Sequence, residues 1–291
     1  MHLRTDLAVE ARELAGEHLA GVDYQTYRQC GMEISRLTVR TERAGQLLGK
    51  EQGTYVTVEL PSLTDRFSDT DERLTVIGKE IRRLLPVNGL LLVAGLGNSA
   101  MTPDALGPQT AAKVLATRHI SGEIARAAGL DRLRPVAVMA TGVTGQTGIE
   151  TGEYILSVAR RIRPTAVIAV DALASRRPER LGRTLQISDA GISPGAGVGN
   201  HRAAINRETL GVPVISIGVP TVVDVRTLAL DLLRSDFQQD TIDTLLPAQH
   251  PLLVIPNEID LLIERASRLI AFSLNAAMQD QFELKELVEL M

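Results

Sequence analysis

The chain has 291 residues, a formal net charge of −4, and a composition of 44% hydrophobic and 23% charged residues. This is typical of a globular protein with a sizeable core. The negative charge gives no reason to expect nucleic acid or an anionic membrane as a partner. The single cysteine, Cys30, excludes an intramolecular disulfide and fits a reducing compartment. The sequence shows neither a signal peptide nor an apolar run that could span a bilayer, so we expect a cytoplasmic protein.

The first third of the chain predicts a helix followed by antiparallel strands. Apolar residues recur at helical spacing over 6–20. Apolar and polar residues alternate over 32–40 and 54–60, which predicts two antiparallel strands joined by a short helix and a turn at 50–53. The segment 65–85 is polar at first and then helical.

The rest of the chain alternates strand-like and helical segments. Short runs rich in Val and Ile predict strands at 89–95, 135–140, 165–170 and 212–218, with one more at 184–187. Helical periodicity occurs at 104–117, 151–162, 202–209, 222–236 and 257–278. Alternation of this kind predicts an α/β fold with a mostly parallel sheet covered by helices on both faces, here with an N-terminal antiparallel extension.

Two aspartates follow the predicted parallel strands. Asp171 comes directly after Ala-Val-Ile-Ala-Val, and Asp104 lies in Thr-Pro-Asp, shortly after Leu-Leu-Leu-Val-Ala-Gly. The carboxyl ends of parallel strands share the edge at which ligands bind, so we expect the two carboxylates to meet there. Each also has a structural interpretation. Thr102 and Pro103 are typical of a helix start with Asp104 in its first turn, and Asp171 can cap a turn or helix.

Two loops rich in glycine are candidates for binding a peptide backbone. Thr144 and Gly145 belong to the loop 141–148, which could donate N–H groups to an oxyanion or could simply be a flexible connection. Gly197 and Gly199 belong to the loop 193–200. That loop lacks the Lys-Ser/Thr of a phosphate-binding loop, so we expect close approach of another chain segment.

Arginines cluster soon after Asp171, among them Arg176 and Arg180. They form either a solvated basic face or a pocket for an acidic substrate side chain. His201 has no carboxylate or second histidine at ligand spacing. The sequence therefore predicts no metal site and no cofactor.

Eight motifs together resemble one family. They are R-T-D-L-A-V-E-A at 4–11, G-L-G-N at 95–98, T-P-D-A-L-G-P at 102–108, T-R-H at 117–119, G-x-T-G-I-E-T at 145–151, A-V-D-A-L-A at 169–174, and the long runs at 186–200 and 209–224. The chain resembles the germination proteases of spore-forming bacteria over nearly its whole length. It departs from their pattern between about 236 and Pro251, where it is shorter.

The resemblance implies an atypical aspartic-type endopeptidase, unrelated in fold to pepsin and similar in fold to hydrogenase maturation proteases. Its essential aspartates would be Asp104 and Asp171. It also implies a homotetrameric zymogen that removes a propeptide, residues 1–6, by cutting between Asp6 and Leu7. Residues 7–291 would then form one domain with its core at about 87–236 and a C-terminal helical tail at about 250–291.

The implied substrates are small acid-soluble spore proteins, cut after an acidic and before an apolar residue in the spore core during germination. Arg176 or Arg180 would then contact the acidic residue before the cut. Because the chain starts upstream of Leu7, we expect the zymogen form. Two rival interpretations are a metal-dependent maturation-type protease, using the carboxylates with His201 or Glu150, and a nucleotide-binding α/β protein. A third is a silent store of zymogen.

Overall fold

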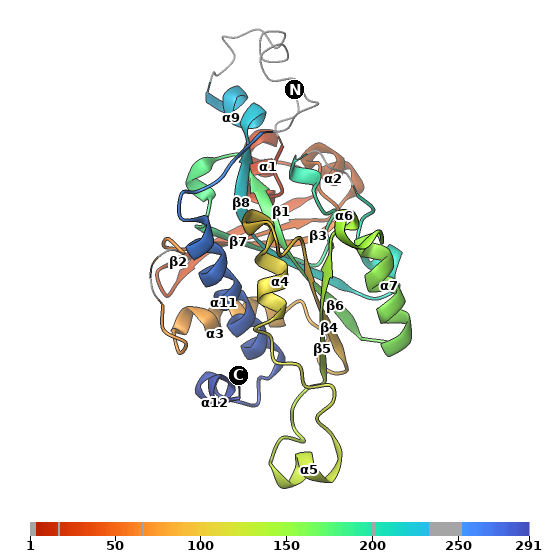
Figure 1. Ribbon diagram of the computed structural model, residues 1–291. Helices are drawn as coiled ribbons and strands as arrows, with labels where there is room; N and C mark the ends of the chain where they lie inside the picture. The colour runs from red at the N-terminus through yellow and green to blue at the C-terminus, as the bar shows by residue number, and fades with distance from the viewer. Residues whose placement is uncertain are drawn as a thin grey trace.

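A mixed β-sheet with helices on both faces forms the centre of the computed structural model, which describes residues 4–16, 18–63, 65, 67–198, 202–232 and 252–290 (Figure 1). The strands in this described part are β1 (Val22–Gln29), β2 (Met32–Val39), β3 (Gly53–Glu59), β4 (Leu91–Leu96), β5 (Val136–Gly142), β6 (Ala166–Ser175), β7 (Thr184–Ser188), β8 (Val214–Asp224) and β9 (Leu253–Val254).

The helices of the same residues vary from one turn to 20 residues in length. The α-helices are α1 (Ala8–Ala15), α2 (Glu42–Leu48), α3 (Glu72–Arg82), α4 (Leu106–Ala111), α5 (Gly122–Ala127), α6 (Thr144–Thr147), α7 (Thr151–Ile162), α8 (Arg207–Leu210), α9 (Val225–Leu232), α11 (Ile259–Met278) and α12 (Leu284–Glu289). Short 3₁₀ turns are η1 (Thr102–Asp104), η2 (Pro178–Arg180) and η3 (Ala196–Val198).

The sheet has a parallel and an antiparallel region. Strands β5, β4, β6 and β8 are neighbours in that order and run parallel, and we call them the parallel region. Strands β7, β3, β2 and β1 continue the sheet beyond β8 with antiparallel pairing, and we call them the antiparallel region. The predicted fold class is confirmed, including the pairing of the two N-terminal strands across a short helix.

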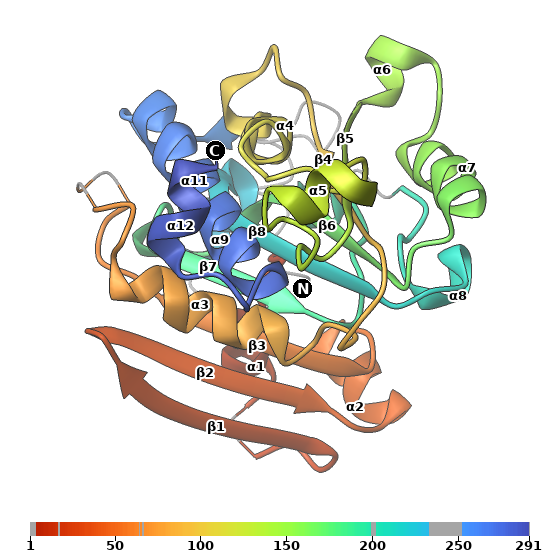
Figure 2. The same cartoon turned by 90° about the horizontal axis from the view of Figure 1, so that it is seen from below.

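The antiparallel region is larger than the sequence predicts. Strand β1 was not predicted, because it is a mostly polar and exposed edge strand without an apolar alternation. Strand β7, expected only as an extra strand, is the link between β3 and β8. Figure 2 shows β1, β2 and β3 extending the sheet away from the parallel strands.

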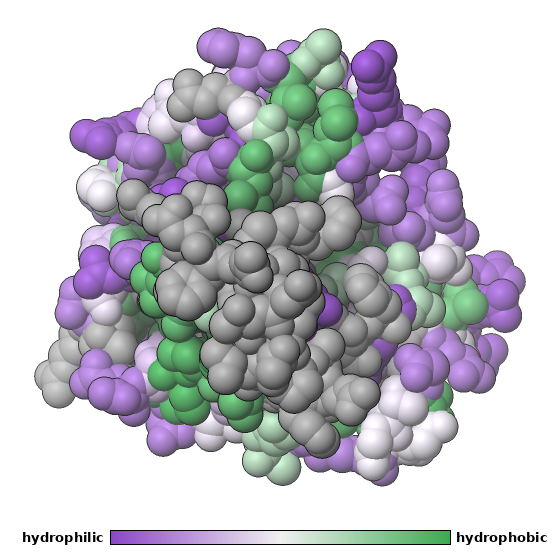
Figure 3. Space-filling model, turned by 90° about the horizontal axis from the view of Figure 1, so that it is seen from above, coloured by the Kyte–Doolittle hydropathy of each residue, from purple (hydrophilic) through white to green (hydrophobic). Residues whose placement is uncertain are grey.

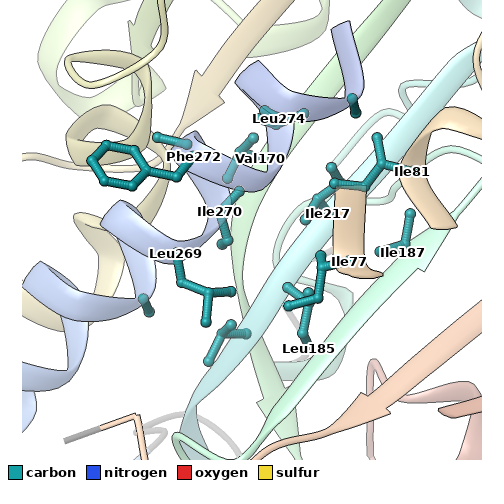
Figure 4. Packing of buried hydrophobic residues seen from close by; sticks show 14 of the residues in the cluster. Ile77, Ile81, Val170, Leu185, Ile187, Ile217, Leu269, Ile270, Phe272 and Leu274 are labelled. Carbon is teal, nitrogen blue, oxygen red and sulfur yellow. The ribbon is translucent and has the colours of Figure 1, made fainter. Parts of the chain in front are cut away.

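The largest cluster of buried side chains lies between the sheet and two helices. Ile77 and Ile81 of α3 face Leu269 and Ile270 of α11, over apolar side chains of β6, β7 and β8 (Figure 4). Full burial of one such side chain contributes about 1.5–3 kcal/mol. Most residues of α11 are buried. The helix expected in a C-terminal tail is therefore part of the core.

The helix boundaries predicted from periodicity are less accurate than the strands. The helix α1 ends at Ala15, before the positive φ of Gly16, rather than at residue 20. The predicted helix 104–117 contains η1 and then α4, which ends at Ala111. The prediction for 151–162 is confirmed. The end of the helix predicted at 222–236 lies outside the described residues, as does the segment from 236 to Pro251.

The carboxyl ends of the parallel strands point to one end of the molecule. Helices α6 and α9, which follow β5 and β8, both lie toward the top of Figure 1. Figure 3 looks onto this end and shows apolar surface next to hydrophilic surface. Exposed apolar side chains of α9 and β9 and their neighbours are Leu232, Leu252, Leu253 and Ile255. In the described ranges no helix is both long and apolar enough to cross a membrane.

Candidate active site

Asp171 lies inside β6 and is 6% exposed. The sequence predicted a strand end here, but β6 continues to Ser175 because β8 extends alongside it. Asp171 therefore starts no helix, and its Oδ1 accepts a hydrogen bond of 2.9 Å from the N–H of Ala172. Asp171 pairs across the sheet with Gly218, which in turn pairs with Gln186 of β7.

These three residues form one row across the sheet. Paired residues on neighbouring strands point to the same face. Gly218 has no side chain of its own, and the side chain of Leu173 lies against the position that a Cβ would take there. The backbones of Asp171 and Gln186 are about 10 Å apart, which is two strand spacings. A cavity of about 450 Å³ is lined by all three residues.

Asp104 lies in η1, just past β4. Its Oδ2 accepts a hydrogen bond of 2.7 Å from the N–H of Asn98, so it closes a turn. The N-cap expected at Thr102 is not formed: the residue before η1 is Met101, which makes no side-chain cap. Strand β4 is the direct neighbour of β6 and ends level with Asp171, so both carboxylates reach the same edge.

The two aspartates affect each other's protonation. Burial raises the pKa of Asp171 well above its ordinary value, and the negative charges of Asp104 and Asp6 raise it further. Burial also raises the pKa of Asp104, while the N–H of Asn98 and the positive charge of Arg202 oppose this. Two neighbouring carboxylates do not both ionise readily, so the pair can hold one proton.

Asp6, the first residue of the predicted cleavage site Asp6–Leu7, lines the same cavity. The N–H of Asp6 donates to the carbonyl oxygen of Ala174 on β6 at 2.9 Å, and the N–H of Ala174 donates to the Asp6 carboxylate at 2.8 Å. The Asp6 carboxylate also accepts from the N–H of Gly197. Leu7 is fully buried in an apolar cluster with Leu173. The chain thus binds its own Asp–Leu dipeptide beside Asp171.

Side chains also hold the peptide group between Asp6 and Leu7. The carbonyl oxygen of Asp6 accepts from Lys50 Nζ and from Gln186 Nε2, each at 2.9 Å. The N–H of Leu7 donates to Thr5 Oγ1 at 3.0 Å. The N–H of Ala8 donates to Gln186 Oε1 at 2.7 Å. Gln186 therefore binds the backbone on both sides of the peptide bond.

Of the four predicted loop residues, Gly197 is the one that contacts this dipeptide. A Cβ at this position would overlap the Asp6 carboxylate, so the close approach requires glycine. Gly199 lies outside the described residues, and so does His201.

The loop containing Thr144 and Gly145 approaches the other aspartate. Gln146 Nε2 donates to Asn98 Oδ1 at 2.6 Å, and the N–H of Asn98 holds Asp104. Thr144 donates to Glu150, and Gly145 is exposed with open space around its Cα. This loop thus supports the turn that holds Asp104.

The two arginines expected to contact an acidic substrate residue instead bind α1. Arg176 is paired with Glu13 and Asp231. Arg180 is paired with Glu10, Glu13 and Glu59, the last of these on β3. Both arginines are thus paired with Glu13 of α1. Their contacts are with residues that follow the Asp6–Leu7 bond.

Three residues of the site were missed from the sequence: Lys50, Gln186 and Arg202. Gln186 left little signal, because it occupies a polar position in the alternating pattern Thr-Leu-Gln-Ile at 184–187. Lys50 is one of only four lysines among the 31 Lys and Arg residues, which is too weak a signal to predict a role. Arg202 lowers the pKa of both aspartates but lies about 30 or more residues away from each of them in the sequence.

Comparison with known proteins shows the family of this chain. The sequence profile of the germination protease family matches residues 4–238. Relatives called germination protease include those of Caldanaerobacter subterraneus subsp. tengcongensis, 41% identical over 99% of this chain and 98% of the relative, and of Clostridium tetani, 38% identical over the same shares. The germination protease of Priestia megaterium is 34% identical over 97% of this chain and 95% of the relative.

Among solved structures, the comparison matches the [NiFe] hydrogenase maturation protease HycI of Thermococcus kodakarensis KOD1. It has a TM-score of 0.38 and 17% identity, and it covers 67% of this chain and 98% of its own. The family assignment does not depend on it, because the sequence relatives extend over nearly the full length of both partners. The chain belongs to the germination protease family and is a peptidase with a role in spore germination.

Proposed function

We propose that this peptidase is an aspartic-type endopeptidase that first cuts its own chain between Asp6 and Leu7 and then cleaves small acid-soluble spore proteins after acidic residues. The observation that carries the proposal is the intact Asp6–Leu7 peptide at the cavity lined by Asp171. An acidic residue before the bond and an apolar residue after it are the types that the proposed preference requires.

The chemistry is hydrolysis by two carboxyl groups that share one proton. The ionised carboxylate takes a proton from water, whose oxygen forms a bond to the carbonyl carbon of Asp6 as the carbonyl electron pair moves onto its oxygen. The protonated carboxyl gives its proton to the nitrogen of Leu7, and the C–N bond breaks as the pair on oxygen returns. The products are a carboxyl group on residue 6 and an amine on residue 7, and the aspartates again hold one proton.

Asp171 is the group that holds the shared proton in this proposal. Its burial and the charges of Asp104 and Asp6 raise its pKa well above the ordinary value. The Asp104 carboxylate accepts a hydrogen bond from the N–H of Asn98, which favours its ionised form. Asp104 is therefore the base that activates water.

Specificity for an acidic residue before the bond is supported by two backbone donors. The N–H groups of Ala174 and Gly197 both point at the Asp6 carboxylate. Backbone N–H groups that converge on one point bind anions without a cationic side chain. A substrate with Asp or Glu at this position would make the same contacts.

Family membership supports the remaining parts of the proposal. The protein would be stored as a zymogen, assemble as a homotetramer and act in the spore core on proteins released to it during germination. The self-bound segment supports the zymogen in particular, since residues 5–8 occupy the place that a substrate would take.

The test is to map the N-terminus of the full-length chain by mass spectrometry during incubation at mildly acidic pH. We expect a new terminus at Leu7. Asp104→Asn and Asp171→Asn should each slow its appearance about 10²- to 10⁴-fold, the usual contribution of one acid or base, whereas the exposed Asp131→Asn should not. A fully active Asp104→Asn protein would overturn the proposal. The same incubation with a chelator distinguishes the two mechanisms. Self-cleavage by an aspartic mechanism continues in its presence, whereas self-cleavage by a metal-dependent protease stops.

A further inference from the structure

The carbonyl oxygen of Asp6 is the atom on which negative charge would develop during cleavage. The two side chains that donate to it come from the antiparallel region. Lys50 lies in the turn before β3, and Gln186 lies on β7. Both donor distances, 2.9 Å, are those of well-formed hydrogen bonds.

We propose that Lys50 and Gln186 form the oxyanion hole of this peptidase. They polarise the carbonyl group before attack and stabilise the negatively charged oxygen of the tetrahedral intermediate. The inference rests on the proposed function, because Asp104 and Asp171 are taken to activate the water and protonate the leaving nitrogen. No proton is transferred from either donor: the electron pair moves onto the oxygen when the C–O bond forms, and it returns when the C–N bond breaks.

Lys50 is suited to this role by its position. Its Nζ donates to two successive carbonyl oxygens, those of Thr5 and Asp6, at 3.1 and 2.9 Å. Burial lowers the pKa of Lys50, and the negative charges of Asp6 and Glu10 oppose this shift. A cation already held at the oxyanion stabilises a developing negative charge better than one that must be brought there from bulk water.

Gln186 is suited to the role by its fixed orientation. Its Oε1 accepts the N–H of Ala8 at 2.7 Å, which turns its Nε2 toward the Asp6 oxygen. The side chain is buried on β7, in the row that contains Gly218 and Asp171. A donor that is already oriented costs little reorganisation when charge develops. Asp6, Asp171 and Gln186 all line the same cavity.

A purely positioning role is the alternative, and the two roles predict different kinetics. Donors that only hold the segment affect ground-state binding, so their loss raises KM. Donors that stabilise the oxyanion act in the transition state, so their loss lowers kcat. Cleavage of a separate peptide with Asp-Leu at its centre measures both constants on protein that has completed its own processing.

The experiment compares Lys50→Met, Lys50→Arg and Gln186→Glu with the wild type. Gln186→Glu keeps the acceptor for Ala8 and removes the donor to Asp6. We expect kcat to fall about 10²- to 10³-fold in Lys50→Met and in Gln186→Glu, the usual effect of losing one oxyanion donor, with KM changed far less. Lys50→Arg should recover part of the loss. The exposed Lys79→Met and Gln25→Glu are matched controls and should cleave at the wild-type rate.

A phosphinic peptide, in which a tetrahedral phosphorus replaces the carbonyl carbon, gives a second readout. Its inhibition constant should rise by the factor by which kcat/KM falls, while the affinity of the cleaved product peptide should change little. Wild-type kcat in both Lys50→Met and Gln186→Glu would overturn the oxyanion hole and leave the proposed function standing. A wild-type chain that makes no cut after Asp6 would instead overturn the proposed function. If Lys50→Met does not fold by circular dichroism, Gln186→Glu decides the matter.

Discussion

In the proposed mechanism, the parallel and antiparallel regions of the sheet supply different groups to one site. The parallel region supplies the carboxyl groups: Asp171 lies on β6 and Asp104 follows β4. The antiparallel region and the turn before β3 supply the donors, Gln186 and Lys50. The two regions meet at Gly218 of β8, which pairs with Asp171 on one side and with Gln186 on the other. Under this proposal the acid pair depends on the parallel α/β topology, whereas binding of the peptide backbone depends on the antiparallel extension.

Among residues not covered by the experiments above, we expect the largest effect on self-cleavage from Gly197, in the loop that follows β7. Gly197→Ala places a Cβ against the Asp6 carboxylate. Misplacing a reacting bond by about 1 Å can reduce the rate about 10²-fold, so we expect self-cleavage to slow by about that factor while the fold is kept.

Gly152→Ala is the matched control for this loop variant, because a Cβ there makes only an ordinary contact of 3.7 Å with Ile205. The appearance of the Leu7 terminus, followed by mass spectrometry, measures both variants. Equal rates in Gly197→Ala and Gly152→Ala would show that the loop does not define the acidic pocket.

A moderate effect is expected on stability as pH rises, and it tests the parallel region alone. The folded-state pKa of Asp171 is raised, so the folded protein binds this proton more tightly than the unfolded chain. The stability it provides is fully present below the ordinary carboxyl pKa and is lost as pH rises through the folded value. Each tenfold change in proton affinity is worth about 1.4 kcal/mol.

Asp171→Asn has no proton to lose, so its Tm relative to the wild type should increase between pH 4 and pH 8. Asp131→Asn should show no such trend, because Asp131 is exposed. Thermal unfolding in both buffers measures the difference. A constant offset for Asp171→Asn would mean that the carboxyl is not perturbed in the folded state.

The smallest effect on specificity should come from the arginines. Arg180 binds Glu10, Glu13 and Glu59, so Arg180→Ala should lower the free energy of unfolding by about 1–3 kcal/mol, less than for a fully buried pair. The preference for Asp over Asn before the bond should be unchanged. Arg28→Ala is the control, since its pair with Glu33 is exposed and worth about 0–1 kcal/mol.

The preference is measured as the ratio of kcat/KM for two peptides that differ only at that position. Loss of the preference for Asp in Arg180→Ala would restore the basic pocket that the sequence suggests and would count against the pocket made by Ala174 and Gly197.

The sequence predicted most of the parallel region and only half of the site. Asp104 and Asp171 could be found because an acidic residue after an apolar run is conspicuous, and parallel strands place such residues at one edge. Asp6 and Leu7 could be found only through the resemblance to a family. Their position beside Asp171 depends on hydrogen bonds between segments 168 residues apart, which no local pattern encodes.

The donors were missed for a physical reason. Gln186 acts through the register of β7 against β8, and register is set by the whole sheet rather than by a local run. Lys50 lies in a turn whose composition predicts only a turn. The arginines show what a local pattern leaves out: their clustering suggests a pocket, and the structure adds long-range ion pairs with Glu13 of α1. A role in binding an acidic substrate residue stays a prediction.

Leu7 is the residue directly before α1 and is fully buried. In the uncut chain its nitrogen is part of a neutral amide. Cleavage would turn that nitrogen into an ammonium group at the amino end of a helix, where the helix dipole repels a cation. Moving a new charge out of bulk water into this buried position is also unfavourable. We therefore expect the first cut to loosen the segment that occupies the cavity. Self-cleavage would in this way open the site to other proteins.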